Sequence, residues 1–405
     1  MRTTAEQDLV IYGATGFTGK LIAEHLATRY GAGDKLRWAL AGRSRERLAS
    51  VRDSIGLPES FPLIVANADD PSSLQRLAEQ TRVCISAVGP YQLYGSEMVA
   101  ACAAAGTDYV DLCGEPAWMR WMIDAHEKTA RSSGARIVFS CGFDSIPFEL
   151  GVLAVQRAAE AATGAPLKRV KARVLKLRGT FSGGTLASLR ANVAAAADPA
   201  VRALLTDHFS LTPNFRGPEQ PDTTAPQFDA ALGVWLAPFL MATINTRIVH
   251  RSNYLQHHRY GADFVYEEAM VAGRGAQGEA TAKAIAGANA GLAKAEGPKP
   301  GEGPSLEERQ AGSYELLFLG STPPSASAPS GATFKAVVTG DRDPGYGSTS
   351  KMVAETALCL LDETNGAAGG IWTPGALLGE RLTERLVKHA GLTFTASRDS
   401  DPPLT

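Results

Sequence analysis

Residues 8–142 of this 405-residue chain alternate between short apolar segments and segments with helical periodicity. The apolar segments occupy residues 8–13, 36–42, 61–66, 82–89, 108–113 and 135–142. Strands that alternate with helices predict βαβ units around a parallel sheet. Because these strands are almost continuously apolar, helices are expected to cover both faces of that sheet. We therefore predict an α/β fold whose first domain, residues 1–150, is a doubly wound parallel sheet.

The pattern changes after residue 150. Segments such as 168–179 and 313–321 alternate polar and apolar residues, which is typical of a strand with one solvated face. They predict a second domain of the α+β type, residues 151–342, that is built on a largely antiparallel sheet.

The last part of the chain, residues 343–405, is expected to consist of helices that return to the first domain. Helical patterns occur at 348–363 and 374–391. An apolar run in the second domain, Gly233 to Ile244, is too short to span a bilayer and is interpreted as a buried helix. The alternative is that this run lines a groove for a long acyl chain.

Three glycines mark the junction between the first predicted strand and the first predicted helix. In a Rossmann-type turn the first glycine permits the tight turn, the second lets the backbone approach a pyrophosphate, and the third lets the helix pack closely on the sheet. The N-terminus of the helix then attracts the phosphates. The predicted dinucleotide-binding residues are Gly13, Ala14, Thr15, Gly16, Phe17, Thr18 and Gly19. The alternative is a glycine-rich surface turn.

The end of the second predicted strand indicates which dinucleotide binds. A site for NAD usually has Asp or Glu there, whereas a 2′-phosphate favours arginine. This chain has Gly42, Arg43 and Ser44 at that point and no acidic residue. We therefore predict NADP(H) as the cofactor, with Arg43 on the 2′-phosphate. The alternative is a solvated basic start of a helix.

Two later strand ends belong to the same edge of the predicted sheet, where parallel strands place their ligands. Asn67 and Asp69 follow the third strand and are predicted to meet the adenine amino group. Val88, Gly89 and Pro90 follow the fourth and are predicted to pass under the nicotinamide ribose. The alternative is that both stretches are turns without a ligand.

Reduction by a nicotinamide requires a proton donor from the protein. Tyr91 follows the fourth strand and Asp144 follows the sixth, and these are the predicted catalytic candidates. The alternative for Asp144 and the serine after it is a helix N-cap. Cys141, in the same loop, is predicted to contact the cofactor, with a small buried hydrophobic residue as the alternative. Ser182 and Thr185 are further hydroxyl candidates from the second domain.

Several motifs occur in a characteristic order: GATGFTG, AGRS, AVGPYQLYG, YVDLCGE, CGFDSIPFELG and, later, DPGYGSTSKM. With them the chain resembles the saccharopine dehydrogenase-like oxidoreductases, and more narrowly the branch that contains actinobacterial trans-acting enoyl reductases. The resemblance implies an N-terminal Rossmann domain, a second domain with a largely antiparallel sheet, and C-terminal helices that pack back. It carries over no catalytic residue.

Three functions are compatible with these observations. The first is an NADP-dependent reductase of a C=C bond in acyl or polyketide lipid intermediates. The second is a saccharopine-type amino-acid or imine dehydrogenase, which would need arginines in the cleft. The third is a non-catalytic NADPH-binding sensor or scaffold, which would need no proton donor. An apolar cleft at the nicotinamide would favour the first function.

Composition and motifs also limit which partners, reaction types and cellular location we expect. The net charge of −2 does not favour nucleic acid, and the expected partner is a small molecule or a lipid on an acyl carrier. No Y-x-x-x-K, G-x-S-x-G or H-E-x-x-H motif occurs, and the spacing of His257 and His258 does not suggest a metal site. The five isolated cysteines and the lack of a signal-like start predict a cytoplasmic protein with reduced thiols. Peripheral membrane contact and a homodimer are left open.

Overall fold

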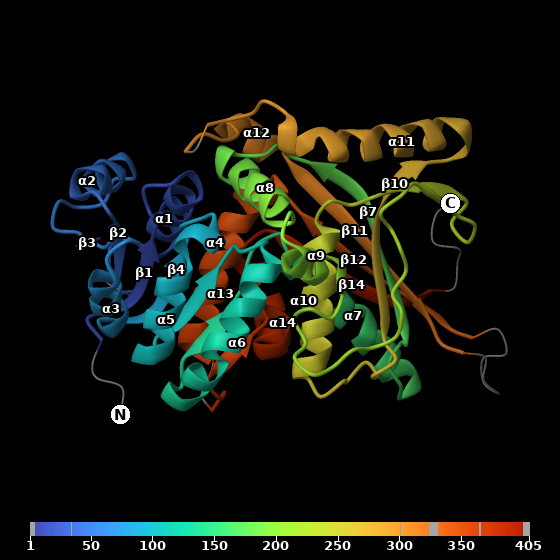
Figure 1. The fold of residues 1–405 in the computed structure, drawn as a ribbon, viewed down its shortest axis with the longest axis horizontal. Helices are drawn as coiled ribbons and strands as arrows, with labels where there is room; N and C mark the ends of the chain where they lie inside the picture. Colours follow the sequence, from blue (N-terminus) through green and yellow to red (C-terminus); the bar gives the residue numbers. More distant parts are fainter. Residues whose placement is uncertain (1–4, 34, 300, 324–330, 364–365, 400–405) are drawn as a thin grey trace.

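In the computed structural model, which describes residues 5–33, 35–299, 301–323, 331–363 and 366–399, the chain forms two seven-stranded sheets (Figure 1). The first sheet has the order β13-β6-β5-β4-β1-β2-β3, and all its paired strands are parallel. Its strands are β1 (Gln7–Tyr12), β2 (Trp38–Gly42), β3 (Leu63–Val65), β4 (Thr81–Ser86), β5 (Asp108–Asp111), β6 (Arg136–Val138) and β13 (Gly370–Trp372). The predicted α/β class and parallel sheet are confirmed.

Helices cover both faces of the first sheet because its strands are apolar on both sides. In β1, Leu9 and Ile11 join one buried cluster, whereas Val10 and Tyr12 join another. The helices of this part are α1 (Phe17–Tyr30), α2 (Arg45–Ser54), α3 (Pro71–Glu79), α4 (Tyr91–Tyr94), α5 (Ser96–Ala105), α6 (Pro116–Ser133) and α13 (Thr349–Glu363). Helix α13, from the C-terminal part of the chain, packs on α1, β4 and β5.

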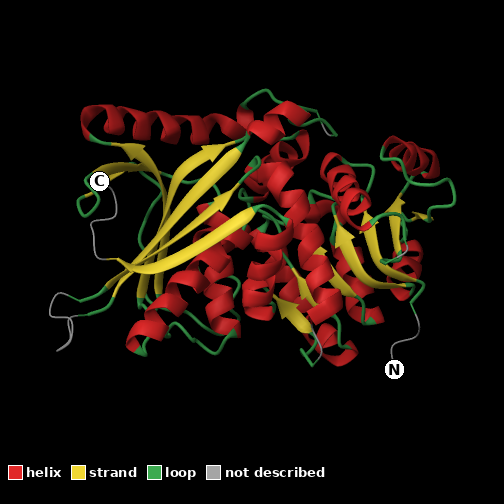
Figure 2. Ribbon diagram, turned by 180° about the vertical axis from the view of Figure 1, so that it is seen from behind, coloured by secondary structure: helices red, strands yellow, loops and turns green. Residues whose placement is uncertain are grey.

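The second sheet has the order β14-β12-β11-β7-β10-β9-β8 (Figure 2). Its strands are β7 (Arg169–Arg178), β8 (Gln227–Asp229), β9 (Val234–Ala237), β10 (Val265–Gly273), β11 (Ser313–Ser321), β12 (Thr333–Gly340) and β14 (Leu392–Asp399). Only the β7–β10 pair is parallel among these described strands. The prediction of a largely antiparallel second sheet is therefore confirmed.

The remaining helices follow the first six strands in the chain. They are α7 (Ile146–Thr163), α8 (Gly183–Ala195), α9 (Pro199–Thr206), α10 (Ala242–Leu255), α11 (Gly275–Gly291), α12 (Leu306–Ala311), α14 (Pro374–Leu377) and α15 (Gly379–His389), with the short turns η1 (Leu292–Lys294) and η2 (Pro344–Ser348). Helix α7 contacts β11, β12 and β14, and α10 contacts β10, so these two helices supply the core of the second domain.

Two local predictions from the sequence are wrong. The apolar run from Gly233 to Ile244 is not one helix, because it forms β9, a short connection that contains Pro238 and the start of α10. Proline lacks the N–H that a continuing helix would need. The C-terminal segment also contains two strands that were not predicted. Strand β13 extends the first sheet beside β6, and β14 extends the second sheet beside β12.

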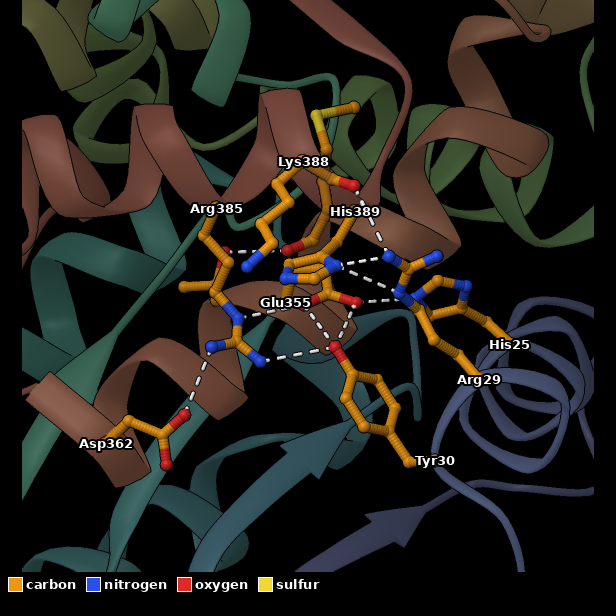
Figure 3. Close-up of polar contacts among 10 residues, drawn as sticks. His25, Arg29, Tyr30, Glu355, Asp362, Arg385, Lys388 and His389 are labelled. Carbon is orange, nitrogen blue, oxygen red and sulfur yellow. Dashed lines mark hydrogen bonds and ion pairs between the residues drawn. The ribbon is translucent and has the colours of Figure 1, made fainter.

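A buried carboxylate ties α13 to α1 and α15 (Figure 3). The side chain of Glu355 is completely buried. It accepts hydrogen bonds from His25 Nε2 at 2.7 Å, from the Tyr30 hydroxyl at 2.9 Å and from Arg385 Nε at 2.8 Å. His25 and Tyr30 belong to α1, the helix that begins in the glycine loop, so the C-terminal helices are fastened to that element.

Candidate functional site

The glycine loop has the steric features that a dinucleotide-binding turn requires. Gly13 has a φ of 91°, and a Cβ there would lie 2.7 Å from the Val88 side chain. A Cβ at Gly19 would lie 2.2 Å from the Gly13 carbonyl oxygen, so the close approach of α1 to the turn needs a glycine. Gly16 occupies the N-cap position of α1 and provides no side-chain cap. The first N–H groups of α1 are thus available to an anion.

The guanidinium of Arg43, at the end of β2 beside this loop, is available to bind a ligand. Arg45 donates to the Leu63 carbonyl and Arg47 to the Thr15 carbonyl, and the Ser44 hydroxyl accepts from the Arg47 N–H at the start of α2. Within the described part of the chain, the exposed Arg43 has no hydrogen-bond or ion-pair partner. A free guanidinium at the end of β2, with no acidic residue there, fits a 2′-phosphate.

The other predicted cofactor residues lie at the carboxyl ends of their strands. Asn67 and Asp69 follow β3 as a partly exposed turn, in which the Asn67 side chain accepts from the Asp69 N–H at 3.5 Å. Val88 packs against Gly13, and Gly89 lines a cavity. Cys141 is different, because its fully buried thiol lies 3.4 Å from the Val138 carbonyl and lines neither cavity described below. Its geometry matches the small buried hydrophobic residue.

Two cavities meet between the sheets, beyond the carboxyl ends of β1, β4, β5 and β6. The first cavity, of about 450 Å³, reaches the glycine loop at Gly16 and the β4 turn at Gly89. The second, of about 350 Å³, is bounded by the second domain and by η2. Both are lined by Thr18, Leu112, Asp144, Phe181, Thr185, Leu240 and Met241. Ligands of open parallel sheets bind at this edge, so the shared wall marks the candidate active site.

The chemistry of the lining is predominantly apolar. Among the described residues that line the two cavities, none is Arg, Lys or His, and Asp144 is the one carboxylic acid. The other polar groups are hydroxyls and the amides of Asn192 and Asn289. Such a lining accommodates an uncharged chain and offers no cation for the carboxylates of an amino acid.

Asp144 lies where the cavities join and is free to act on a ligand. Helix α7 has Ser145 at its N-cap with no side-chain cap hydrogen bond, so the capping role considered for this pair is not observed. In the part of the chain that the structure describes, the Asp144 carboxyl has no hydrogen-bond partner, and burial is the only influence on its pKa. Burial raises the pKa of Asp144 to about 7. The group can therefore hold a transferable proton near neutral pH.

A second carboxyl lies behind Asp144. Glu268 on β10 is completely buried and accepts from Asn245 Nδ2 at 2.9 Å and from the Tyr266 hydroxyl at 2.8 Å. Burial, together with the nearby charge of Asp144, raises the pKa of Glu268 to about 8 in spite of these hydrogen bonds. Two such neighbours cannot both ionise readily, so protons are retained at this point of the cleft.

Tyr91 lines the first cavity with its ring but not with a free hydroxyl. Its hydroxyl donates to the Ser86 carbonyl at 2.9 Å and accepts from the Leu112 N–H at 3.2 Å. Burial raises the pKa of Tyr91 well above its usual value. The phenol thus links the ends of β4 and β5, and this geometry favours Asp144 over Tyr91 as the proton donor.

The structure adds two residues that the sequence did not single out, Tyr346 and Thr349. Both line the second cavity and come from the DPGYGSTSKM motif, which was interpreted only as a packing element. The Tyr346 hydroxyl contacts Thr185 Oγ1 at 2.6 Å and accepts from the Ser182 N–H, and its ring packs edge-on against Phe17 at 5.2 Å. The motif therefore connects the glycine loop with the second domain.

Comparisons with known proteins agree with this architecture. Residues 9–138 match the model of the saccharopine dehydrogenase NADP binding domain. A Mycobacterium tuberculosis protein named "Putative trans-acting enoyl reductase" is 41% identical, over 98% of this chain and 99% of its own length. A trans-acting enoyl reductase of Mycobacterium ulcerans is 38% identical, over 97% and 98%.

Among solved structures, the apo saccharopine dehydrogenase (L-Glu forming) of Saccharomyces cerevisiae covers 97% of this chain and 100% of its own, with a TM-score of 0.55 and 12% identity. That likeness concerns the fold. No helix in the described ranges is long and apolar enough to cross a membrane. Together with the glycine loop and the inter-domain cleft, the relatives show that the chain belongs to the saccharopine dehydrogenase-like oxidoreductases, in the group of the trans-acting enoyl reductases, and that its cofactor is NADP(H).

Proposed function

We propose that the protein reduces the C=C bond of an enoyl thioester with NADPH. The observation that carries this proposal is the apolar inter-domain cleft, with Asp144 as the one carboxylic acid and no basic side chain among its described lining residues. The names of the relatives support the same reaction. A saccharopine-type substrate carries several carboxylates, and this lining would bury them without a counter-charge.

The dinucleotide would be held by the glycine loop from Gly13 to Gly19, by Arg43 at the adenosine end, and by the β4 turn at Gly89 toward the nicotinamide. Ser44, Asn67 and Asp69 would complete the adenosine side, and Val88 and Pro90 the turn. When bound, NADPH supplies the hydride for the β-carbon of the enoyl group.

The chain itself supplies the proton. Asp144 in its protonated form would donate to the α-carbon, which completes a saturated acyl thioester and leaves the Asp144 carboxylate. The half-buried Asp144, which lines both cavities, would then regain a proton from water in the cavity. Phe181, Leu240 and Met241 line both cavities around it and limit the access of bulk water. Low water content strengthens this proton transfer.

The substrate is expected to be presented on an acyl carrier, because the relatives are named trans-acting. We also infer a cytoplasmic location, where the five buried cysteine thiols would stay reduced. The carrier can be tested directly by offering one enoyl chain on coenzyme A and on a carrier protein. A higher kcat/KM for the carrier-bound form is the expected result.

The reaction is tested by following NADPH absorbance with enoyl thioesters of short, medium and long chains. Oxidation of NADPH with stoichiometric formation of the saturated thioester is expected. Saccharopine and related amino acids, offered with NADP, serve as the comparison. Turnover of those compounds without any turnover of enoyl thioesters would show the proposal to be wrong, and tight NADPH binding with neither activity would indicate a sensor or scaffold.

The Arg43 assignment predicts a cofactor-selective defect. Arg43→Ala is expected to weaken NADPH binding by on the order of 1.5–3 kcal/mol, roughly 10- to 150-fold, because one charge-assisted contact is lost. NADH has no 2′-phosphate. We therefore expect the affinity for NADH, which is lower than that for NADPH in wild type, to change little. Calorimetric titration of both dinucleotides measures the difference. Arg45→Ala is the matched control, because Arg45 already donates to a backbone carbonyl. Equal losses for NADPH and NADH would contradict the assignment.

A further inference from the structure

Helix α11 of the second domain contributes Ile285 to the wall of the second cavity. Helix α11 lies across the end of β10 (Figure 1). Its residues Gly278, Ala282, Ile285 and Asn289 are spaced by four, three and four residues, so they share one face. Gly278 and Ala282 are buried against the sheet, whereas Ile285 and Asn289 line the second cavity.

The contacts on either side of Ile285 hold it in place. A Cβ at Gly278 would lie 2.3 Å from the Gly273 carbonyl oxygen, so the helix packs directly on the end of β10. Eleven residues further on, Asn289 Nδ2 donates to the Pro238 carbonyl at 3.0 Å. The helix is thus fixed on both sides of Ile285, and the wall that Ile285 forms is a defined surface.

The wall of the second cavity opposite Ile285 begins next to Asp144, the proposed proton donor. On β10, Glu268 interacts electrostatically with Asp144, and Met270 lines the second cavity. Residues two apart on a strand point to the same face about 6.5 Å from each other. The second cavity therefore begins at Asp144 and extends along β10 to Met270 and Ile285. Phe143 and Phe239 complete its apolar wall.

The size and chemistry of this space suit a hydrocarbon chain. A cavity of about 350 Å³ is more than twice the ~150 Å³ apolar cavity that takes up benzene. Three polar groups on its wall are already engaged: the Tyr346 hydroxyl with Thr185, the Thr349 hydroxyl with the Phe143 N–H and the Pro344 carbonyl, and the Asn289 amide with Pro238. The first cavity is lined by residues of the glycine loop and by the exposed Val193.

We propose that the second cavity binds the alkyl tail of the acyl substrate, beyond the double bond, and that Ile285 and Met270 limit the length of that tail. This inference rests on the proposed function, because it places the double bond beside Asp144. The thioester end would then leave through the first cavity toward solvent. Substrate selection by chain length would follow from these two side chains, because both stand in the wall of the cavity.

The test is substitution of Ile285 and Met270 with larger and smaller side chains. Ile285→Phe and Met270→Phe are expected to lower kcat/KM for long-chain enoyl thioesters by at least about tenfold, because one methylene in a hydrophobic pocket is worth roughly 10- to 200-fold. Values for short chains should stay within about twofold. Ile285→Ala should extend the range to longer chains. Ala284→Phe, an exposed position on the same helix, is the matched control and should change nothing.

Binding distinguishes failure of this site from failure of the proposed reaction. Calorimetry with saturated acyl thioesters needs no turnover, and Ile285→Phe should weaken the binding of long chains alone. One outcome is that wild type reduces no enoyl thioester, while Ile285→Phe still weakens the binding of long-chain saturated thioesters alone. The proposed tail site is then correct and the proposed reaction is wrong. If wild type turns over enoyl thioesters and the two phenylalanine variants affect all lengths equally or none, the tail site is wrong.

Discussion

Asp144→Asn is expected to lower kcat for enoyl reduction by about 10²- to 10⁴-fold, which is the usual contribution of a general acid. Asparagine has nearly the shape of aspartic acid but holds no proton to transfer to the α-carbon. Asp144 is the one carboxylic acid on the described walls of the cleft, so no neighbouring acid in those walls can replace it. NADPH affinity should stay close to that of wild type, because the cofactor residues are untouched. The rate of NADPH oxidation at saturating substrate measures the effect.

The pH profile gives an independent measurement on the same group. Since burial raises the pKa of Asp144 to about 7, the acid form dominates below that value, and kcat should fall as pH rises above it. The residual activity of Asp144→Asn should lack this descending limb. A wild-type limb that persists unchanged in the variant would assign the titration to another group.

The free energy of unfolding of Asp144→Asn distinguishes a loss of catalysis from a folding defect. The folded-state pKa of Asp144 lies above its ordinary value of 3.8, so the stability that its protonation contributes is present below 3.8 and is lost as pH rises through about 7. Asp144→Asn should therefore be at least as stable as wild type above pH 7.

Tyr91→Phe provides the comparison for activity. It removes two structural hydrogen bonds, with the Ser86 carbonyl and the Leu112 N–H, so we expect a loss of stability of about 1–3 kcal/mol and less than a tenfold loss of kcat.

Glu355→Gln is expected to destabilise the protein by on the order of 3 kcal/mol at neutral pH. The carboxylate is fully buried and binds His25, Tyr30 and Arg385 from two other helices. Removing one partner of a buried ion pair is costly because the remaining charge keeps its desolvation penalty. Denaturant titration of both proteins measures the difference. Glu380→Gln is the matched control, because its exposed pair with Arg157 should contribute at most about 1 kcal/mol.

The Glu355 effect should depend on pH in a defined direction. Burial alone would raise the pKa of Glu355, but the hydrogen bonds and charges of His25 and Arg385 outweigh burial and hold this pKa below its ordinary value of 4.5. The stability that Glu355 contributes is therefore present above 4.5 and is lost as pH falls through the lower folded-state pKa. The gap between wild type and Glu355→Gln should narrow in that acidic range. A gap that does not change with pH would mean that shape, and not charge, carries the effect.

The prediction of the first sheet from the sequence succeeded because its signals are local. Hydrophobic runs of strand length, helical periodicity and the glycines at Gly13, Gly16 and Gly19 each act within one turn or one strand. Arg43 at the end of β2 is also a local signal, since it predicts NADP(H) without knowledge of any distant residue; its contact with the 2′-phosphate stays a prediction. Strands β7 and β11 were also predicted, because one solvated face gives each of them an alternating pattern.

Tertiary structure decided the features that depend on residues far apart in the chain. Strand β13 has three residues and becomes a strand by pairing with β6, more than two hundred positions earlier. Asp144 and Tyr91 looked equivalent as strand-end residues, but their roles diverge in the fold. The Tyr91 hydroxyl is engaged by β4 and β5, whereas the Asp144 carboxyl is left at the junction of two cavities.

The sequence by itself thus determined the nucleotide fold, the cofactor and the antiparallel character of the second sheet, because each is written in short-range patterns of polarity and backbone freedom. The cleft and its chemistry were decided only when the second domain folded onto the first. Ile285 and Met270, which have no motif, acquire their place from the packing of α11 on β10. The raised pKa of Asp144 likewise arises from burial, which exists only in the assembled tertiary structure.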